Sequence, residues 1–434
     1  MSDGTGLAEK MLGLPGVRVL EVNECVGEVV ITVESTKTKV WCGSCRKKAQ
    51  AHDRVEVQLR DVHCFGRSTH LVVRKRRWRC RHKGCVKKTW TEKIDGVATR
   101  QVLTVRAGAE VTRQVGQECR SVASVSREYG VGWDTTWSAV TFHGTPLVDD
   151  PRRVGRVRAL GVDEHGFLAA TAKHSTIYAT TLVDLDRRQV IDLFKGKTAA
   201  KLRQWLGGRS ERWRKAVKVV ALDLTDTYRS GLNPHLAHAK KVADPFHVVR
   251  VANRMVDQVR RRVQQESLGH RGRKVDPLFR IRKLLVKGDE RLDDKGREKL
   301  LAGLRVGDPN DELLGAWLAK EALRAVYLVE EPDEAAVLLD NAIEACKTDD
   351  VPEIRTMGNT LSRWRTEILN HHRTGGASNG PTEGQNFCAK QVKRAGRGIP
   401  NFGHYRLRVL LYAGGVTWPT TVCPPRIRHT RRPH

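Results

Sequence analysis

The stretch VRALGVDEHGF at residues 157–167 predicts a short buried strand, because apolar residues lead up to two acids and a glycine follows. The chain around this strand is strongly basic, so the presence of two acids there requires an explanation. A carboxylate at the end of a strand can cap a turn or form a surface ion pair. Because side chains alternate between the two faces of a strand, Glu164 should point away from Asp163 and have a structural role.

The residues after this strand continue a regular α/β pattern. Residues 175–196 predict a hairpin, a helix follows, and AVKVVALDLTDTY at 216–228 predicts a further strand that ends in acids. Residues 240–266 predict a short strand that passes into a long helix. Three strands in a meander, followed by helix, strand, helix and strand, indicate a ribonuclease-H-like α/β core.

Two further segments complete the carboxy-terminal half. Residues 277–372 predict long amphipathic helices that interrupt the core, and one of them carries an apolar stripe at helical spacing. The predicted stripe comprises Leu314, Trp317, Leu318, Ala322, Ala325, Val326 and Val329. The segment GASNGPTEGQNFCAKQVKRAG at 376–396 then predicts a glycine-rich loop that leads into a helix near Glu383.

The acids of this core suggest phosphodiester chemistry. In a ribonuclease-H-like sheet the first and fourth strands are adjacent, so Asp163 and Asp223 should converge, and Glu383 can join them from a later helix. Phosphodiester cleavage without a covalent intermediate commonly uses two divalent cations about 3.5–4 Å apart. Mg²⁺ prefers hard oxygen ligands. We therefore expect these three acids to hold two Mg²⁺ or Mn²⁺ ions.

The second acid has alternatives. Asp244, in VADPFH, lies on the next predicted strand, and Asp226 is a further option. Asp244 could instead orient His247 or cap the helix that follows it.

Four cysteines predict a metal site near the amino terminus. Cys42 and Cys45 form a C-x2-C knuckle, and Cys80 and Cys85 form a C-x4-C knuckle. Two such pairs can place four thiolates around one structural Zn²⁺. Cys64 and His82 lie nearby and could substitute as ligands. The unpaired cysteines, Cys25, Cys119, Cys346, Cys388 and Cys423, are expected to be inert.

Composition predicts a cytoplasmic protein that meets a polyanion. The chain has 78 Lys and Arg against 49 Asp and Glu, a net charge of +29, and nucleic acid is the commonest large polyanion. No apolar run is long enough to span a bilayer, and the start lacks a secretion signal. Few Tyr and Phe argue against a reader of single strands by stacking, and the Trp residues are expected in the core.

Basic and polar residues suggest two kinds of DNA contact. The presumed zinc knuckles are crowded with cations suited to phosphates, namely Arg76, Arg77, Arg79, Lys83 and Lys87. Residues 100–142 look helical, and SVASVSREYGVGWDTTWSAV resembles a helix-turn-helix with small Ser126 four residues before the turn glycine Gly130. Asp134 would cap the second helix of this motif. Three exposed side chains of that helix would face the base edges in a DNA groove, namely Thr135, Thr136 and Ser138. Residues 143–153 read as a linker.

These motifs together resemble the insertion-sequence transposases of the ISL-three group. The resemblance rests on TEGQNFCAKQVKRAGRGIPNFGHYRLRVLLY, on ADPFHVVRVANRMVDQVRR and on the two cysteine knuckles, and it spans Trp41 to Gly415. It implies that Asp163, Asp223 and Glu383 are a DDE triad with a helical insertion before the glutamate. It also implies a zinc ribbon and helix-turn-helix that read the terminal inverted repeats of the element. The C-x4-C knuckle is slightly wider than the family pattern.

The expected division of the chain follows from these motifs. It comprises a hairpin segment at 1–40, a zinc ribbon at 41–98, a helix-turn-helix domain at 99–145, core parts at 154–265 and 376–416, a helical insertion at 266–375 and a basic tail at 417–434. After Glu383, the basic continuation of the helix adds three expected DNA contacts, Lys390, Lys393 and Arg394.

The expected function is a DNA transposase that cleaves the ends of its element and joins them to target DNA, as a homodimer because two ends react. It would act on double-stranded DNA at the bacterial nucleoid. Two other functions fit parts of the sequence: a non-enzymatic zinc-ribbon regulator, and a structure-selective nuclease of the same fold. A separate sequence-reading module argues against the nuclease, and three acids at core positions argue against the regulator.

Overall fold

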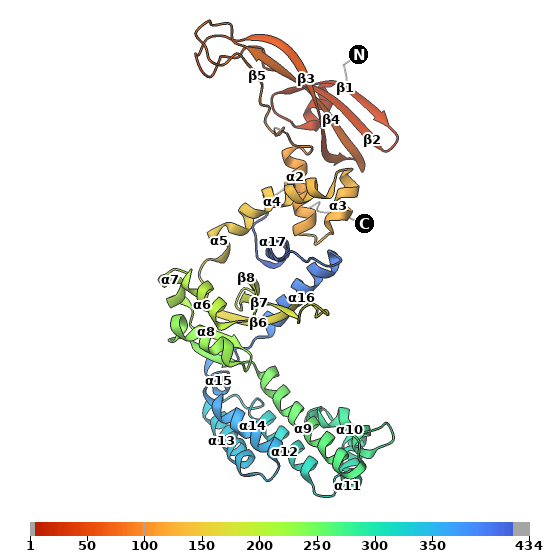
Figure 1. The fold of residues 1–434 in the computed structure, drawn as a ribbon, viewed down its shortest axis with the longest axis vertical. Coiled ribbons are helices and arrows are strands. Elements are labelled where there is room, and N and C mark those ends of the chain that lie inside the picture. Colours follow the sequence, from red (N-terminus) through yellow and green to blue (C-terminus); the bar gives the residue numbers. More distant parts are fainter. Residues whose placement is uncertain (1–4, 99, 420–434) are drawn as a thin grey trace, which may run out of the picture. The chain divides into compact units, whose positions relative to one another are not determined.

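The computed structural model describes residues 5–98 and 100–419, which divide into two compact units (Figure 1). Within the described residues, the first unit holds the chain up to Arg153 and again from Cys388 onward, and the second holds Val154–Phe387. No helix in these ranges is both long and apolar enough to cross a lipid bilayer. Cys423 and the basic segment RIRHTRR at 426–432 lie outside the described residues.

The amino-terminal part of the first unit is a five-stranded sheet. Its strands are β1 (Val17–Cys25), β2 (Glu28–Ser35), β3 (Gln50–Cys64), β4 (Arg67–Arg79) and β5 (Thr89–Thr91). They lie in the order β1-β2-β4-β3, and β5 pairs with β4. The hairpin predicted after residue 17 is confirmed as β1 and β2, and β2 pairs with β4 in parallel, so the hairpin and the cysteine-bearing strands share one sheet. Val33, Leu71 and Val73 form its fully buried centre, and helix α1 (Thr5–Leu12) packs on it.

Helices form the rest of the first unit: α2 (Val105–Gly116), α3 (Val122–Tyr129), α4 (Trp133–Asp149), α5 (Pro151–Val154) and α17 (Phe402–Ala413). Thr104 and Ser121 accept backbone hydrogen bonds as the N-caps of α2 and α3. Gly130 ends α3 with a φ of 61°, a conformation that glycine adopts without strain. A three-residue turn therefore joins α3 to α4.

Two expectations about α4 are wrong. Residues 143–153 form the end of α4 and the short α5, with no intervening linker. Gly144 lies directly against α17, where a Cβ atom would approach Leu411 to 2.9 Å, so tertiary packing overrides the turn preference of this segment. The N-cap of α4 is Gly132, not Asp134. Asp134 lies in the first turn, where a negative charge still favours the helix dipole.

Thr136 is not available to a DNA groove. It is fully buried, and its Oγ1 accepts a 2.9 Å hydrogen bond from Ser126, the small residue four positions before the turn glycine Gly130. The hydroxyl therefore joins α3 to α4. Thr135 is half-buried and Ser138 is exposed.

A mixed five-stranded sheet lies at the centre of the second unit. Its strands are β6 (Ala159–Leu168), β7 (Ile177–Asp184), β8 (Gln189–Lys195), β9 (Val219–Leu222) and β10 (Lys240–Ala243), in the order β10-β9-β6-β7-β8. The predicted hairpin is confirmed as β7 and β8, and the predicted contact of the first and fourth strands is confirmed as the parallel pairing of β6 with β9. The expectation that the first strand ends at Asp163 is wrong, because β6 continues to pair with β7 as far as Leu168.

Helices alternate with the later strands of this sheet. They are α6 (Ala199–Gly207), α7 (Glu211–Ala216), α8 (Asp226–Leu236) and α9 (Pro245–Leu268). Fully buried apolar side chains of β6 and β9, among them Leu160, Val162 and Leu222, pack with α8 and α9 in one core. The observed order is thus the predicted one: a three-strand meander, helices, a strand, a helix and a last strand.

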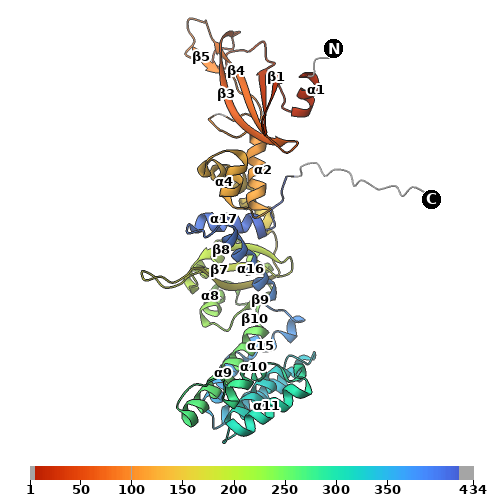
Figure 2. The same cartoon turned by 90° about the vertical axis from the view of Figure 1, so that its right-hand side faces the viewer.

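Between α9 and the last helix of the second unit lies a run of helices. They are α10 (Pro277–Leu285), η1 (Asp289–Arg291), α11 (Asp294–Gly307), α12 (Glu312–Ala325), α13 (Pro332–Thr348), α14 (Pro352–Arg363), α15 (Arg365–Leu369) and η2 (His372–Thr374). Helices α10 and α12 contact α9, and α11 contacts α10; α9, α10 and α11 are labelled together in both views (Figures 1 and 2).

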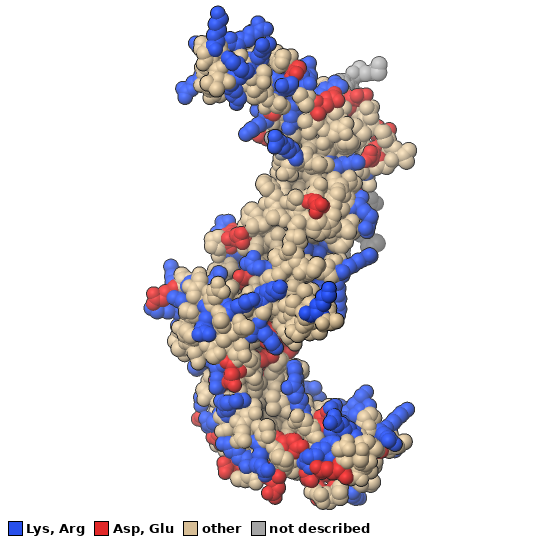
Figure 3. All heavy atoms as spheres, in the orientation of Figure 1, with Lys and Arg blue, Asp and Glu red and all other residues tan. Residues whose placement is uncertain are grey.

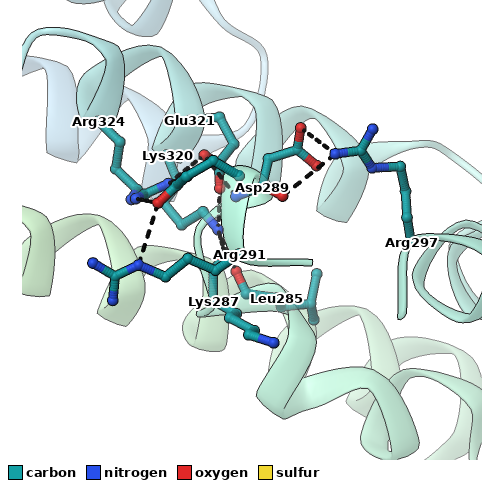
Figure 4. Close-up of polar contacts among 9 residues, drawn as sticks. Leu285, Lys287, Asp289, Arg291, Arg297, Lys320, Glu321 and Arg324 are labelled. Carbon is teal, nitrogen blue, oxygen red and sulfur yellow. Dashed lines mark hydrogen bonds and ion pairs between the residues drawn. The ribbon is translucent and has the colours of Figure 1, made fainter. Parts of the chain in front are cut away.

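The stripe predicted on α12 is partly wrong. Leu318 is 54% exposed, and the buried face consists of Leu313, Ala316, Trp317, Lys320, Leu323 and Val326. A lysine, Lys320, lies in the middle of this face and is held by polar contacts (Figure 4). Because lysine counts as a polar residue in a sequence pattern, the pattern did not identify this face as the buried one.

Candidate functional site

Three acids lie in one row across neighbouring parallel strands of the second unit. Val162 on β6 pairs with Leu222 on β9, and Leu222 pairs with Ala243 on β10. The next residue on each strand is therefore at the same level, and these residues are Asp163, Asp223 and Asp244. The register thus brings the two predicted aspartates together and adds Asp244, the alternative second acid.

Helix α16 (Gly380–Ala395) brings the glutamate to this row. Its first turn lies directly on β6 at Gly161, where a Cβ atom would come within 2.0 Å of Thr382 Oγ1. Asn379 fixes the approach, because its side-chain amide donates to the Val162 carbonyl at 3.1 Å and its backbone N–H donates to Asp244 Oδ1 at 2.8 Å. Only glycine in β6 permits so close a contact.

One imidazole connects two of the acids. His247, in the first turn of α9, lies with Nδ1 2.6 Å from Asp223 Oδ2 and with Nε2 3.4 Å from Glu383 Oε1. Burial lowers the pKa of His247, but the neighbouring carboxylates, above all Asp223, raise it by more than burial lowers it. The pKa of His247 therefore lies above its usual value. Donor atoms of Asp244, His247 and Glu383 all lie within 4.8 Å of one another.

Asp163 is held in place by hydrogen bonds. Its Oδ1 accepts from the Glu164 backbone at 2.7 Å, and its Oδ2 accepts from Asn386 Nδ2 on α16 at 2.7 Å. Asn386 is itself fixed by Thr181 on β7, whose hydroxyl donates to Asn386 Oδ1 at 2.6 Å. Burial, and next the charge of Asp223, raise the pKa of Asp163 to about 7.

Sequence reasoning did not include His247, Asn379 and Asn386 in the site. Each had a local signal. His247 follows Asp244 by three residues at the start of a helix, so it faces the same end of the sheet. Asn386 follows Glu383 by three residues, one helical turn away on the same face. Asn379 precedes α16, where a side chain can reach the neighbouring strand.

The donor set fits divalent cations with oxygen ligands. Asp223 Oδ1 is buried and has no hydrogen-bond partner among the described residues, which is unusual for a buried carboxylate oxygen. Burial, and next repulsion by the charge of Asp223, raise the pKa of Asp163, so a cation at this site would favour the ionised carboxylate. Hard oxygen donors of this kind are those that Mg²⁺ and Mn²⁺ prefer.

A small cavity opens beside Asp223. It has a volume of about 160 Å³ and is lined by His247 and by Arg250 and Arg254, one turn apart on α9. Glu164, for which we expected a structural role, forms a 3.6 Å ion pair with Lys197 and also lines this cavity. Acids and guanidinium groups therefore share one opening.

The four predicted zinc ligands form a cluster in the first unit. The sulfurs of Cys42 and Cys85 lie 3.5 Å apart, as do those of Cys45 and Cys80. A zinc ion with sulfur ligands at about 2.3 Å in a tetrahedron requires sulfurs about 3.8 Å apart. Backbone N–H groups of Cys45 and Ser44 hold the pKa of Cys42 at about 6, which favours the thiolate. Neither Cys64 nor His82 belongs to the cluster that the described residues form.

Basic side chains gather around this cluster (Figure 3). Arg79, Lys83 and Lys87 are exposed, as expected for phosphate contacts. Arg77 is half-buried and forms a 3.1 Å ion pair with Asp53, and Arg76 donates to the Lys37 carbonyl at 3.0 Å. On α16, Lys390 and Arg394 are exposed and Lys393 is partly covered.

Comparison with known families identifies the class of protein. Residues 160–409, more than half of the chain, match the transposase family of the ISL3 type. The chain therefore belongs to the ISL3 family of DDE transposases. Residues 38–85 match the zinc finger of the transposases of IS204, IS1001, IS1096 and IS1165, in agreement with the cysteine cluster.

Individual relatives are transposases of insertion sequences. The chain is 24% identical to the transposase of the element IS1001 from Bordetella parapertussis over 91% of this chain and 94% of that protein. It is 26% identical to the transposase of IS1557 from Mycobacterium tuberculosis over 62% of this chain and 63% of that protein.

Proposed function

We propose that this transposase binds the terminal inverted repeats of its own element, cleaves the DNA strands there and transfers the freed 3′ ends to target DNA. The observation that carries the proposal is the convergence of acids from three separate segments on one imidazole and one row of strand ends. Asp223 and Glu383 both lie within 3.4 Å of His247, and Asp163 is close enough to Asp223 for burial and that charge to raise its pKa. We further propose that the second unit is a ribonuclease-H-like core.

Asp163, Asp223 and Glu383 would hold two Mg²⁺ or Mn²⁺ ions, which when bound supply charge stabilisation to an in-line displacement at phosphorus. The chain itself positions the ligands: Asn386 orients Asp163, and His247 lies between Asp223 and Glu383. Arg250 and Arg254 would hold a DNA phosphate in the cavity beside Asp223.

The first unit would recognise the ends of the element. The exposed cations of the zinc ribbon suit phosphates, and Thr135 and Ser138 of α4 suit base edges in a helix-turn-helix arrangement. Thr136, which is buried, has no part in this proposal. Since two ends react together, the reacting complex would be a homodimer, at the bacterial nucleoid.

Substitution of single acids tests the catalytic proposal. Asp163→Asn, Asp223→Asn and Glu383→Gln should each reduce cleavage of an end-containing duplex by at least about a thousandfold, since each removes a ligand or charge needed in the transition state. Binding of the same duplex should remain within about twofold, because recognition is assigned to other residues. Asp226→Asn, an exposed acid three residues from Asp223, is the matched control and should cleave normally.

Asp244→Asn decides the second acid. If Asp244→Asn is inactive while Asp223→Asn cleaves normally, Asp244 is the ligand and Asp223 only orients His247. If all four variants cleave, the proposed mechanism is wrong.

A further inference from the structure

Trp133 contradicts the expectation that tryptophans serve only as core anchors. It lies in the first turn of α4 and is 44% exposed, whereas Trp78 and Trp364 are almost completely buried. Its ring lies 5.9 Å from that of Trp137 at an angle of 24°, and the ring of His404 lies 4.2 Å from Trp137. The first unit therefore presents a ladder of three aromatic rings with one end open to solvent.

This ladder borders a cavity of about 400 Å³. The cavity lies between the start of α3, the start of α4 and the segment from Gly396 to Arg408, all within the first unit. Three arginines line it, Arg127, Arg397 and Arg408, and no acidic side chain of the described residues does so. Aromatic faces and an excess of cations thus share one wall.

Arg408 is the unusual member of this set. Only 3% of the residue is exposed, its Nη2 donates to the Arg120 carbonyl at 2.9 Å, and its Nε has no hydrogen-bond partner among the described residues. Buried charges in proteins are normally paired, because an unpaired one is costly. In the described part of the chain no carboxylate forms an ion pair with Arg408. A buried cation that lines a cavity and has no counter-charge indicates an anionic ligand.

We propose that this cavity binds one nucleotide of a DNA strand that is locally unstacked, with its base on Trp133 and its phosphate near Arg408, Arg127 and Arg397. Base stacking on an aromatic side chain needs an exposed ring face, which Trp133 offers. The guanidinium groups match phosphate in charge and hydrogen-bonding geometry. The same chemistry would accept a free mononucleotide, but the net charge of +29 favours a polyanionic strand.

The choice of DNA rests on the proposed function, but the site can be tested without cleavage. Binding of a fluorescent ten-nucleotide thymidylate to the full-length protein should be measured beside an abasic strand with the same number of phosphates. Trp133→Ala should weaken binding of the thymidylate by about 5- to 150-fold, the range expected for loss of one base–aromatic stack, and should leave the abasic strand within twofold. Phe142→Ala, which removes a 65% exposed aromatic ring of α4 that does not line the cavity, is the matched control and should change neither.

Arg408→Met separates a binding role from a structural one. A structural arginine would lower the melting temperature when replaced. An unpaired buried charge should leave the melting temperature unchanged or raise it, while binding of both strands weakens. Trp133→Phe should restore most of the thymidylate binding, because a flat ring returns.

Several results would overturn the inference. Equal affinity for the thymidylate and abasic strands would exclude a base site, and unchanged binding by Trp133→Ala would exclude this tryptophan. If thymidine monophosphate displaces the thymidylate strand when both supply the same concentration of nucleotides, the cavity is a site for a free nucleotide instead. Loss of cleavage in Asp223→Asn is read separately, so the proposed function and this site can fail independently.

Discussion

Two of the places where the second unit buries charge differ in how that charge is matched. Lys320 on α12 is completely buried, yet its ammonium group donates to the carbonyls of Leu285 and Lys287 at 2.6 and 2.8 Å and contacts Glu321 at 2.5 Å (Figure 4). Two of its N–H groups therefore have carbonyl acceptors, and the carboxylate of Glu321 supplies the counter-charge. Around β6 and β9, by contrast, Asp223 and Glu383 share one imidazole, Asp163 lies in the same row of strand ends, and Asp223 Oδ1 has no partner among the described residues.

The difference distinguishes structural charge from functional charge. Where the protein supplies a counter-charge and hydrogen-bond acceptors, as at Lys320, the buried ion fixes the packing of the helices. Where partners are missing, the fold bears a cost that a ligand can relieve. The four thiols in the first unit and Arg408 are functional in this sense. The thiols suit a metal cation, and Arg408 suits an anion.

The cysteine cluster should show the largest effect of a missing partner. The protein should contain about one zinc per chain, and Cys80→Ser should abolish protection of the backbone amides in both knuckles, because zinc supplies about 10–16 kcal/mol in comparable sites. Hydrogen exchange over residues 41–49 and 80–91, together with metal analysis, measures this. Cys25→Ser, an exposed cysteine on β1, is the control. A wild-type protein that keeps these amides protected without zinc would contradict the assignment.

Replacing Lys320 should also lower stability strongly, but for a different reason than at the cysteine cluster. Here the change removes a charge that has partners within the protein, so existing contacts are broken. Lys320→Ala should lower the opening free energy of α12 by about 3–5 kcal/mol, since two carbonyls lose their donor and Glu321 keeps only Arg324 as a cationic partner in the described part of the chain. Lys320→Met, which keeps the volume, should cost less. Lys283→Ala, an exposed lysine on α10, should cost under about 0.5 kcal/mol. Native-state hydrogen exchange gives all three values, and a cost of less than about 1 kcal/mol for Lys320→Ala would show that the contacts are dispensable.

Asp163 should behave in the opposite way, because removing its charge relieves the cost of burying that charge and the repulsion by Asp223. Its pKa is raised from 3.8 to about 7, so the folded state holds the proton more tightly than the unfolded chain. The penalty is absent below pH 4, grows between pH 4 and 7, and is complete above pH 7, where it reaches at most about 4 kcal/mol. Asp163→Asn should therefore stabilise the second unit at pH 8 and not at pH 4, as measured by urea unfolding in magnesium-free buffer.

Magnesium provides the control for that prediction. At one hundred times its dissociation constant, Mg²⁺ should stabilise the wild type by about 2.7 kcal/mol at pH 8 and should have much less effect on Asp163→Asn. If Asp163→Asn is less stable than the wild type at pH 8 without magnesium, the hydrogen bonds of Asp163 outweigh the repulsion, and the site resembles Lys320.

The sequence predicts what depends on spacing along one segment. The two cysteine knuckles, the hairpins and the adjacency of β6 with β9 follow from periodicity and from the order of elements, and each is observed. The row formed by Asp163, Asp223 and Asp244 depends on strand register, which needs the pairing partners. The sequence therefore could not choose between the last two acids.

The features that were missed depend on contacts between distant segments. Thr136 is buried because Ser126 meets it from α3, and the segment after residue 143 stays helical because Leu411 packs on Gly144. Lys320 looks exposed in any pattern that treats lysine as polar, since the carbonyls that bind it lie at the end of α10 and just after it, 35 and 33 residues away. Asn379 and Asn386 acquire a role only when α16 lies on Gly161.

The smallest expected effect extends the comparison to the surface of the zinc ribbon. Arg77 has a partner in Asp53 at 3.1 Å, whereas Arg79 is exposed and forms no ion pair among the described residues. A cation that neutralises a DNA phosphate releases about one counterion, so Arg79→Gln should flatten the dependence of log affinity on log salt by about one unit. Arg77→Gln should change that slope by only a few tenths, because Asp53 already neutralises the charge.

Titrations of the wild type and both variants between 50 and 200 mM salt, on end-containing and random duplexes, measure these slopes. Arg79→Gln should weaken binding to both duplexes alike, because a phosphate contact carries no sequence information. If Arg77→Gln flattens the slope as much as Arg79→Gln does, Asp53 must release Arg77 when DNA binds, and a partner within the protein does not mark a charge as structural. Such a result would confine the distinction drawn from Lys320 to buried groups, where a broken ion pair cannot be replaced by water.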